Sequence, residues 1–138
     1  MEIVEDKIKE INPNTIYSEY IPAPLHLEVT SNAEIGLLFY DPDTLNKAFC
    51  APNKIFEYSV FGLPIIGNNI PGLYNTIGRA KAGICTDFSY EGIKKALEEI
   101  YSHYDEYSSM AYKFYDSVDN VKTMRTIAEK LRLKKEEV

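Results

Sequence analysis

The stretch CAPNKIFEYSVFGLPIIGN, Cys50 to Asn68, predicts a helix followed directly by a buried strand. Pro52 favours the start of a helix, because a proline at the first helical position gives up no hydrogen bond. Gly62 favours its end. The apolar residues 63–68 then predict a strand. A helix that leads into an apolar strand is typical of a parallel α/β sheet.

The rest of the chain repeats this alternation. We expect four strands, over residues 15–21, 34–40, 63–68 and 82–87. The run EIGLLFY, 34–40, is apolar at nearly every position, which favours a strand covered on both faces. Helices between such strands predict a Rossmann-like parallel sheet with flanking helices.

The expected helices fill most of the remaining sequence. They cover residues 3–11, 25–32, 52–61, 71–81, 90–101 and 104–136, the last with a break near 118–120, while 41–49 is expected to be a loop. At 138 residues the chain has the length of one domain, and we treat 104–138 as its helical C-terminal extension.

Composition excludes several classes of function. The formal net charge of −6 disfavours a nucleic-acid backbone as partner. Two cysteines make no disulfide framework, and the charged N-terminus is not a signal peptide, so we expect a cytoplasmic protein. The abrupt helical pattern at the N-terminus suggests a piece of a longer protein.

Glu57 is a carboxylate among apolar and aromatic residues of the predicted helix 52–61. It lies four residues after Asn53, so the two share a helix face. The first turn of a helix suits a phosphate, and Lys54 adds a positive charge there. A carboxylate one turn further on accepts both hydrogens of a vicinal diol. This spacing suits a nucleotide, although the same residues also suit an ordinary edge helix.

The segment APNKIFEYSVFGLPIIGNNIPGL resembles the donor-binding core of GT-B glycosyltransferases, most closely the family 4 type. The preceding EIGLLFYDPDTLNKAFC resembles the strand and loop that come before this core in the family. The likeness extends over residues 1–100 and is most specific over 50–73. It implies the C-terminal, nucleotide-sugar-binding domain of a two-domain enzyme, shortened at its N-terminal edge.

The resemblance also implies roles for individual residues. Glu57 would hold the ribose hydroxyls of the donor. The diphosphate would lie along the four residues Ala51, Pro52, Asn53 and Lys54, and the base against Tyr20, Ile21 and Pro22. The family needs no metal and no cofactor, since its substrate is a nucleotide diphosphate sugar of the UDP or GDP type.

Two departures from the family pattern limit these expectations. Phe49 stands where the family often has a second glutamate, so the residue that contacts the sugar is unassigned. The N-terminal half, with the acceptor, is absent. We therefore expect no sugar transfer from these residues alone, and no catalytic residue is assigned. A peripheral membrane contact of the intact enzyme is a further expectation.

Other residues suggest sites only weakly. His26 with Glu28 could form a general base, and Asp41 with Asp43 a metal site, but surface-helix and turn roles are favoured. Cys50 is expected to be an inert thiol. Asn68, Asn69 and Gly72 fit either a turn or a sugar contact.

Tyr101, Tyr104, Tyr112 and Tyr115 recur at helical spacing, as a core stripe or as a surface for a partner or a membrane edge. The favoured function is nucleotide-sugar binding for glycosyl transfer in polysaccharide or glycolipid synthesis. The alternative is a non-catalytic Rossmann-like binding module. A receiver-type signalling domain fits less well, because its acidic cluster and lysine are missing.

Overall fold

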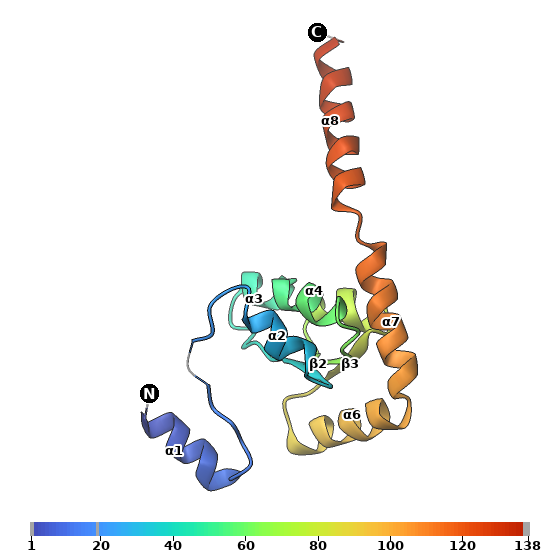
Figure 1. Cartoon of the computed structure of the whole chain (residues 1–138). Coiled ribbons are helices and arrows are strands. Elements are labelled where there is room, and N and C mark those ends of the chain that lie inside the picture. The colour runs from blue at the N-terminus through green and yellow to red at the C-terminus, as the bar shows by residue number, and fades with distance from the viewer. Residues whose placement is uncertain (1, 19, 137–138) are drawn as a thin grey trace.

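A sheet of three parallel strands forms the centre of the protein (Figure 1). The computed structural model describes residues 2–18 and 20–136. The strands are β1 (Gly36–Leu38), β2 (Ile65–Asn68) and β3 (Gly83–Thr86), in the order β1-β2-β3. Ile65 of β2 pairs with Gly36 on one side and with Gly83 on the other. The parallel α/β sheet with flanking helices is thus confirmed.

Helices precede, separate and follow these strands. They are α1 (Glu2–Ile11), α2 (His26–Ser31), α3 (Leu45–Phe49), α4 (Asn53–Ser59), α5 (Pro71–Leu73), the π-helical turn η1 (Tyr74–Gly78), α6 (Tyr90–Ser102), α7 (Tyr104–Ser117) and α8 (Asn120–Glu136). Ser89 caps α6, because its side-chain oxygen accepts a hydrogen bond from the backbone N–H of Gly92.

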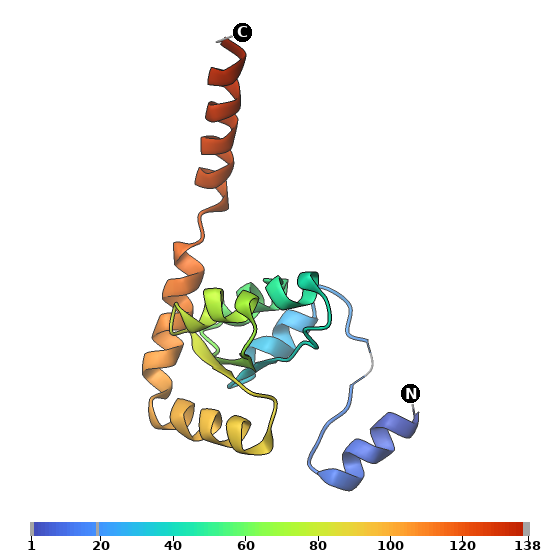
Figure 2. The same ribbon diagram turned by 180° about the vertical axis from the view of Figure 1, so that it is seen from behind.

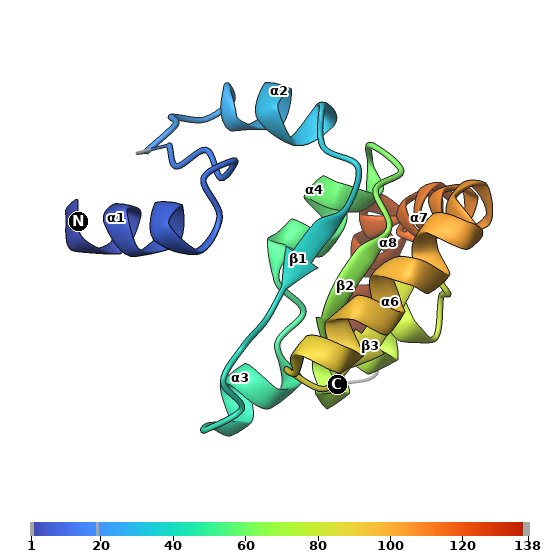
Figure 3. The ribbon, with the colours of Figure 1, turned by 90° about the horizontal axis from the view of Figure 1, so that it is seen from below.

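Apolar side chains leave the sheet on both faces, which is why the strand sequences are apolar throughout. Ile65 packs on one face in a cluster with residues of α4, α5, η1 and α7, including Ile55 and Leu73. Ile66 packs on the opposite face against Ala96 and Ile100 of α6. Figure 3 shows the three strands side by side, with α6 beside β2 and β3.

The strand predicted at 15–21 is wrong for the residues that the structure describes. Residues 15–18, 20 and 21 belong to no strand, and Glu19 lies outside the described residues. Ile16 and Tyr20 are 93% and 87% exposed. The segment has β-forming residues but no neighbouring strand, and a strand needs a partner for its backbone hydrogen bonds. Figure 2 shows it as part of a long connection.

Three helix boundaries also differ from expectation. The predicted loop 41–49 contains the short helix α3, because Thr44 caps its N-terminus by accepting a hydrogen bond from the N–H of Lys47. The helix expected over 52–61 covers Asn53–Ser59, and Pro52 is its N-cap rather than its first residue. The helix expected over 71–81 is divided into α5 and η1.

Strand β1 is covered less completely than its sequence predicts. Leu38 is buried, but Leu37 on the opposite face is 56% exposed. Because α6 packs against β2 and β3, it does not reach this position. The expectation of a strand covered on both faces is therefore wrong for β1.

The C-terminal helices leave the sheet, as Figures 1 and 2 show. Helix α7 packs against α4, and α8 extends beyond it after the predicted break at Val118 and Asp119. Among the residues that the structure describes, no helix is long and apolar enough to cross a bilayer.

Candidate functional site

Glu57 lies on α4 with a quarter of its side chain exposed, and two basic side chains lie beside it. The ammonium group of Lys54 donates a hydrogen bond to its Oε2 atom. Nε2 of His26, on α2, lies 3.5 Å from the same oxygen. Glu57 is thus neither buried without a partner nor freely solvated, and its charge is balanced chiefly by Lys54.

A cavity of about 530 Å³ opens beside Glu57. Helix α4 contributes Asn53, Phe56 and Glu57 to its wall, as expected if Asn53 and Glu57 share a face. The junction of α7 and α8 supplies the opposite wall, with Tyr115, Asp116, Val118 and Asn120. The rings of Phe56 and Phe114 stack with centroids 5.9 Å apart, which holds α4 against α7. The cavity thus combines two carboxylates, two amides and two aromatic rings.

The N-terminus of α4 offers less to an anion than the sequence suggests. The N–H of Ile55 is already bonded to the carbonyl oxygen of Pro52, at 3.0 Å, and Pro52 has no N–H of its own. Asn53 and Lys54 therefore supply the remaining N–H groups of the first turn. The Lys54 side chain reaches Glu57, so binding an anion would require it to move or to be shared.

The residues expected at the diphosphate lie together at the start of α4, whereas those expected at the base lie elsewhere. Ala51 and Pro52 precede α4 directly, so all four expected diphosphate residues lie at one end of this helix. Tyr20, Ile21 and Pro22, the residues expected at the base, do not line the cavity beside Glu57. Tyr20 is 87% exposed on the connection between α1 and α2.

Asn68 and Gly72 have structural roles in this fold. The Asn68 amide exchanges two hydrogen bonds with the backbone of Tyr40, at 3.0 and 2.6 Å, and so extends the pairing of β1 and β2. A Cβ atom at Gly72 would lie 2.1 Å from the carbonyl oxygen of Cys50, so only glycine fits there. These contacts favour the turn-and-packing interpretation of this loop.

The weaker candidates from the sequence are not assembled into sites. His26 lies beside Glu57, not in a pair with Glu28. Asp43 forms an ion pair with Lys47, at 2.8 Å, which stabilises α3. No group of metal-binding side chains occurs in the described ranges. The contact between His26 and Glu57 could not be found from the sequence, because it joins α2 to α4 across the fold.

The tyrosine side chains of α6 and α7 fasten these helices to the rest of the fold. The hydroxyls of Tyr101 and Tyr104 donate to the side chain and the backbone oxygen of Glu34, at 3.2 and 2.9 Å. The hydroxyl of Tyr112 donates to the Phe61 carbonyl oxygen, at 3.1 Å. The rings of Tyr101, Tyr112 and Tyr115 remain partly exposed. Hydrogen bonds therefore hold three of the four hydroxyls, while three of the four rings are partly exposed to solvent.

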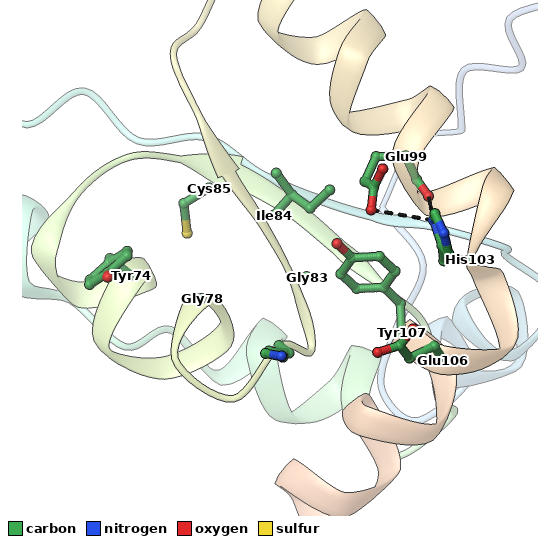
Figure 4. Close-up of a pocket in the computed structure, with 10 residues that line it drawn as sticks. Tyr74, Gly78, Gly83, Ile84, Cys85, Glu99, His103, Glu106 and Tyr107 are labelled. Atoms are coloured by element: carbon green, nitrogen blue, oxygen red, sulfur yellow. Dashed lines mark hydrogen bonds and ion pairs between the residues drawn. The ribbon is translucent and has the colours of Figure 1, made fainter.

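A second cavity, of about 440 Å³, lies between η1, the outer edge of β3 and the α6–α7 corner (Figure 4). Its wall includes Cys85, Glu99, His103 and Tyr107. Burial raises the pKa of the Cys85 thiol from 9.0 to about 11, and a hydrogen bond with the Gly78 backbone opposes this. The thiol therefore stays protonated at neutral pH and is a poor nucleophile.

The histidine in this cavity has a local partner. Nδ1 of His103 lies 3.3 Å from a carboxylate oxygen of Glu99, one helical turn earlier. Both side chains are about half exposed, so this is a surface pair. This cavity could not be predicted from the sequence, because its wall joins η1, β3, α6 and α7, and none of them carries a recognisable motif.

Comparisons of the chain with models of protein families, with curated proteins and with solved structures found no match.

Proposed function

We propose that this chain is the nucleotide-sugar-binding, C-terminal part of a GT-B glycosyltransferase of family 4 type, with a Rossmann-like sheet. In the intact enzyme it would hold a nucleotide diphosphate sugar for transfer to a saccharide or lipid-linked acceptor. The observation that carries the proposal is the position of Glu57, which lines a cavity together with Asn53 at the start of α4. This position agrees with the resemblance of the PNK and FEY segments to the donor-binding core of the family.

The chemistry assigned to Glu57 is positional. Its carboxylate would accept hydrogen bonds from both hydroxyls of the ribose, and each such bond is charge-assisted. To do so it would exchange its bond with Lys54 for bonds to the ligand. The released ammonium group would then be available to the diphosphate beside the N–H groups of Asn53 and Lys54. Binding of the ribose by Glu57 would thus be coupled to binding of the diphosphate by Lys54.

Titration calorimetry with UDP, GDP and ADP tests this proposal. We expect at least one of the three to bind, with affinity about 10- to 100-fold lower in Glu57→Gln, because hydrogen bonds to a charged group contribute about 1.5–3 kcal/mol. Glu28→Gln is the matched control, since it removes the same charge from the exposed surface of α2. Equal affinity of Glu57→Gln and wild type, or no binding of any of the three, would contradict the proposal.

The second candidate is a Rossmann-like binding module without catalysis. The ion pair of Glu57 with Lys54 favours it, since these charges already balance each other without a ligand. In both cases we expect no glycosyl transfer from residues 1–138 alone, because the first candidate requires a separate acceptor-binding half and the second has no catalytic role. A coupled assay with several nucleotide sugars measures this, and turnover would contradict the expectation.

A further inference from the structure

Helix α8 stands apart from the body of the protein. It spans Asn120–Glu136 and projects beyond α7 in both side views (Figures 1 and 2). Every residue from 121 to 130 is exposed. Among them are three large apolar residues, Val121, Met124 and Ile127, with exposed fractions of 62%, 66% and 48%. Apolar side chains at this spacing on a helix normally face a partner.

Helix α8 also differs in charge from the rest of the chain. The whole chain has 15 Lys and Arg and 21 Asp and Glu. Helix α8 contains six of the basic residues and two of the acidic ones, which leaves nine basic and nineteen acidic residues elsewhere. A strongly basic helix is thus attached to a strongly acidic body. Such segregation indicates a negatively charged partner for α8.

The charges are ordered around the helix axis. With about 100° between successive residues, Val121, Met124 and Ile127 form one apolar stripe. Arg125 and Arg132 follow on one flank of this stripe and Lys130 lies on the other. Lys122 and Glu129 lie on the face away from the stripe. Long basic side chains at such a boundary can place their apolar stems beside the stripe and their charges at its rim.

The α7–α8 junction makes α8 an independent helix. Asp119 caps it, because its side-chain oxygen accepts a hydrogen bond from the N–H of Lys122, at 2.8 Å. Its backbone oxygen also accepts from the hydroxyl of Thr123, at 2.9 Å. Helix α8 therefore begins anew after Val118 and does not continue α7.

We propose that α8 binds the surface of an anionic lipid bilayer. The apolar stripe enters the boundary between headgroups and acyl chains, and Arg125, Arg132 and Lys130 meet the lipid phosphates. Pairing of two α8 helices along their stripes fits less well, since it would bring the basic flanks of both helices together. The acidic body is repelled by the same surface and remains on the aqueous side. This surface binding does not depend on nucleotide binding.

Co-sedimentation of the full chain with vesicles tests the inference. We expect binding to vesicles that contain phosphatidylglycerol, little binding to phosphatidylcholine alone, and release at high salt. The double variant Met124→Ser with Ile127→Ser should bind vesicles with an affinity at least about tenfold lower, because it removes most of the apolar area of the stripe.

The matched control is Thr123→Ser with Thr126→Ser, which changes the neighbouring positions outside the stripe and keeps both hydroxyls. We expect it to bind as wild type does. Circular dichroism of each variant in the presence of vesicles checks that helicity is retained. Equal binding to neutral and anionic vesicles, or wild-type binding by the stripe variant, would overturn the inference.

Sedimentation velocity tests whether α8 pairs with a second copy of the chain instead. A dimer that dissociates in the stripe variant, with no vesicle binding by wild type, would assign α8 to a second copy and overturn the membrane proposal. Glu57→Gln should leave vesicle binding unchanged. Loss of nucleotide binding and loss of membrane binding can therefore be told apart.

Discussion

The sheet and helix α8 contrast sharply, although both contain regularly spaced apolar residues. In β2 every residue is buried, and its isoleucines contact helices on both faces. In α8 the apolar residues from 121 to 130 are exposed. Local pattern therefore produces a helix or a strand, but burial requires a second apolar surface within the same chain. The stability of the fold should depend on the first region and hardly on the second.

The largest expected effect comes from breaking the sheet core. Ile66 is fully buried between the sheet and α6, so Ile66→Ala should lower the free energy of unfolding by about 2–5 kcal/mol. Val121→Ala, on exposed α8, should change it by less than about 0.5 kcal/mol. Urea denaturation measures both. Similar losses in the two variants would mean that α8 packs against the body in solution.

A smaller effect is expected where α4 meets α7. Gly62 has a φ of 66°, and a Cβ atom there would lie 2.2 Å from the ring of Tyr112. Gly62→Ala should therefore destabilise the protein by about 1–3 kcal/mol, measured by thermal unfolding. Gly78→Ala is the control, since its new Cβ would meet nothing closer than 3.2 Å, and its loss should be smaller. Equal losses would mean that neither the Tyr112 ring nor the positive φ opposes a side chain at position 62.

Ionisation of the Cys85 thiol should have no effect on stability at neutral pH, where both the folded and the unfolded state hold its proton, but it should decide how fast the thiol reacts. Because burial raises its pKa to about 11, the thiolate fraction at neutral pH is about a hundredfold below that of a thiol with a pKa of 9.0. Alkylation of Cys85 at pH 8 should be correspondingly slow and should accelerate up to about pH 11. Mass spectrometry of iodoacetamide-treated protein, with a Cys50→Ser variant to isolate Cys85, measures the rate.

The same shift predicts the direction of a pH effect on folding. The folded state holds the Cys85 proton more tightly than the unfolded state does. The contribution of the protonated Cys85 thiol to the free energy of unfolding is fully present below pH 9 and is lost as the pH rises through about 11. Rapid alkylation of Cys85 at pH 8 would contradict both expectations and would place the thiol in open solvent.

The sequence predicted the elements around the sheet well, since their signals are local. The break at Val118 and Asp119, the start of the helix at Tyr90 and the strand after Gly62 all appear where the pattern puts them. The short helix α3 was missed because its capping residue, Thr44, is part of a stretch that otherwise has the composition of a loop.

The candidate site was predicted only in part. That Asn53 and Glu57 share a face follows from helical spacing alone, and both line one cavity. The opposite wall comes from the α7–α8 junction, and His26 approaches from α2. Neither could be foreseen, because side chains far apart in the sequence meet only when helices pack.

The sequence alone determined most of the helices and the three strands that join the sheet, because caps, prolines and apolar periods act within a few neighbouring residues. Tertiary structure decided which of these elements are buried. Residues 15–21 have strand-forming side chains and yet join no sheet in the part that the structure describes. Helix α8 has an apolar stripe, Val121, Met124 and Ile127, that stays exposed among the described residues. The physical reason is that strand pairing and hydrophobic burial are satisfied only by a second surface, and a local pattern cannot supply one.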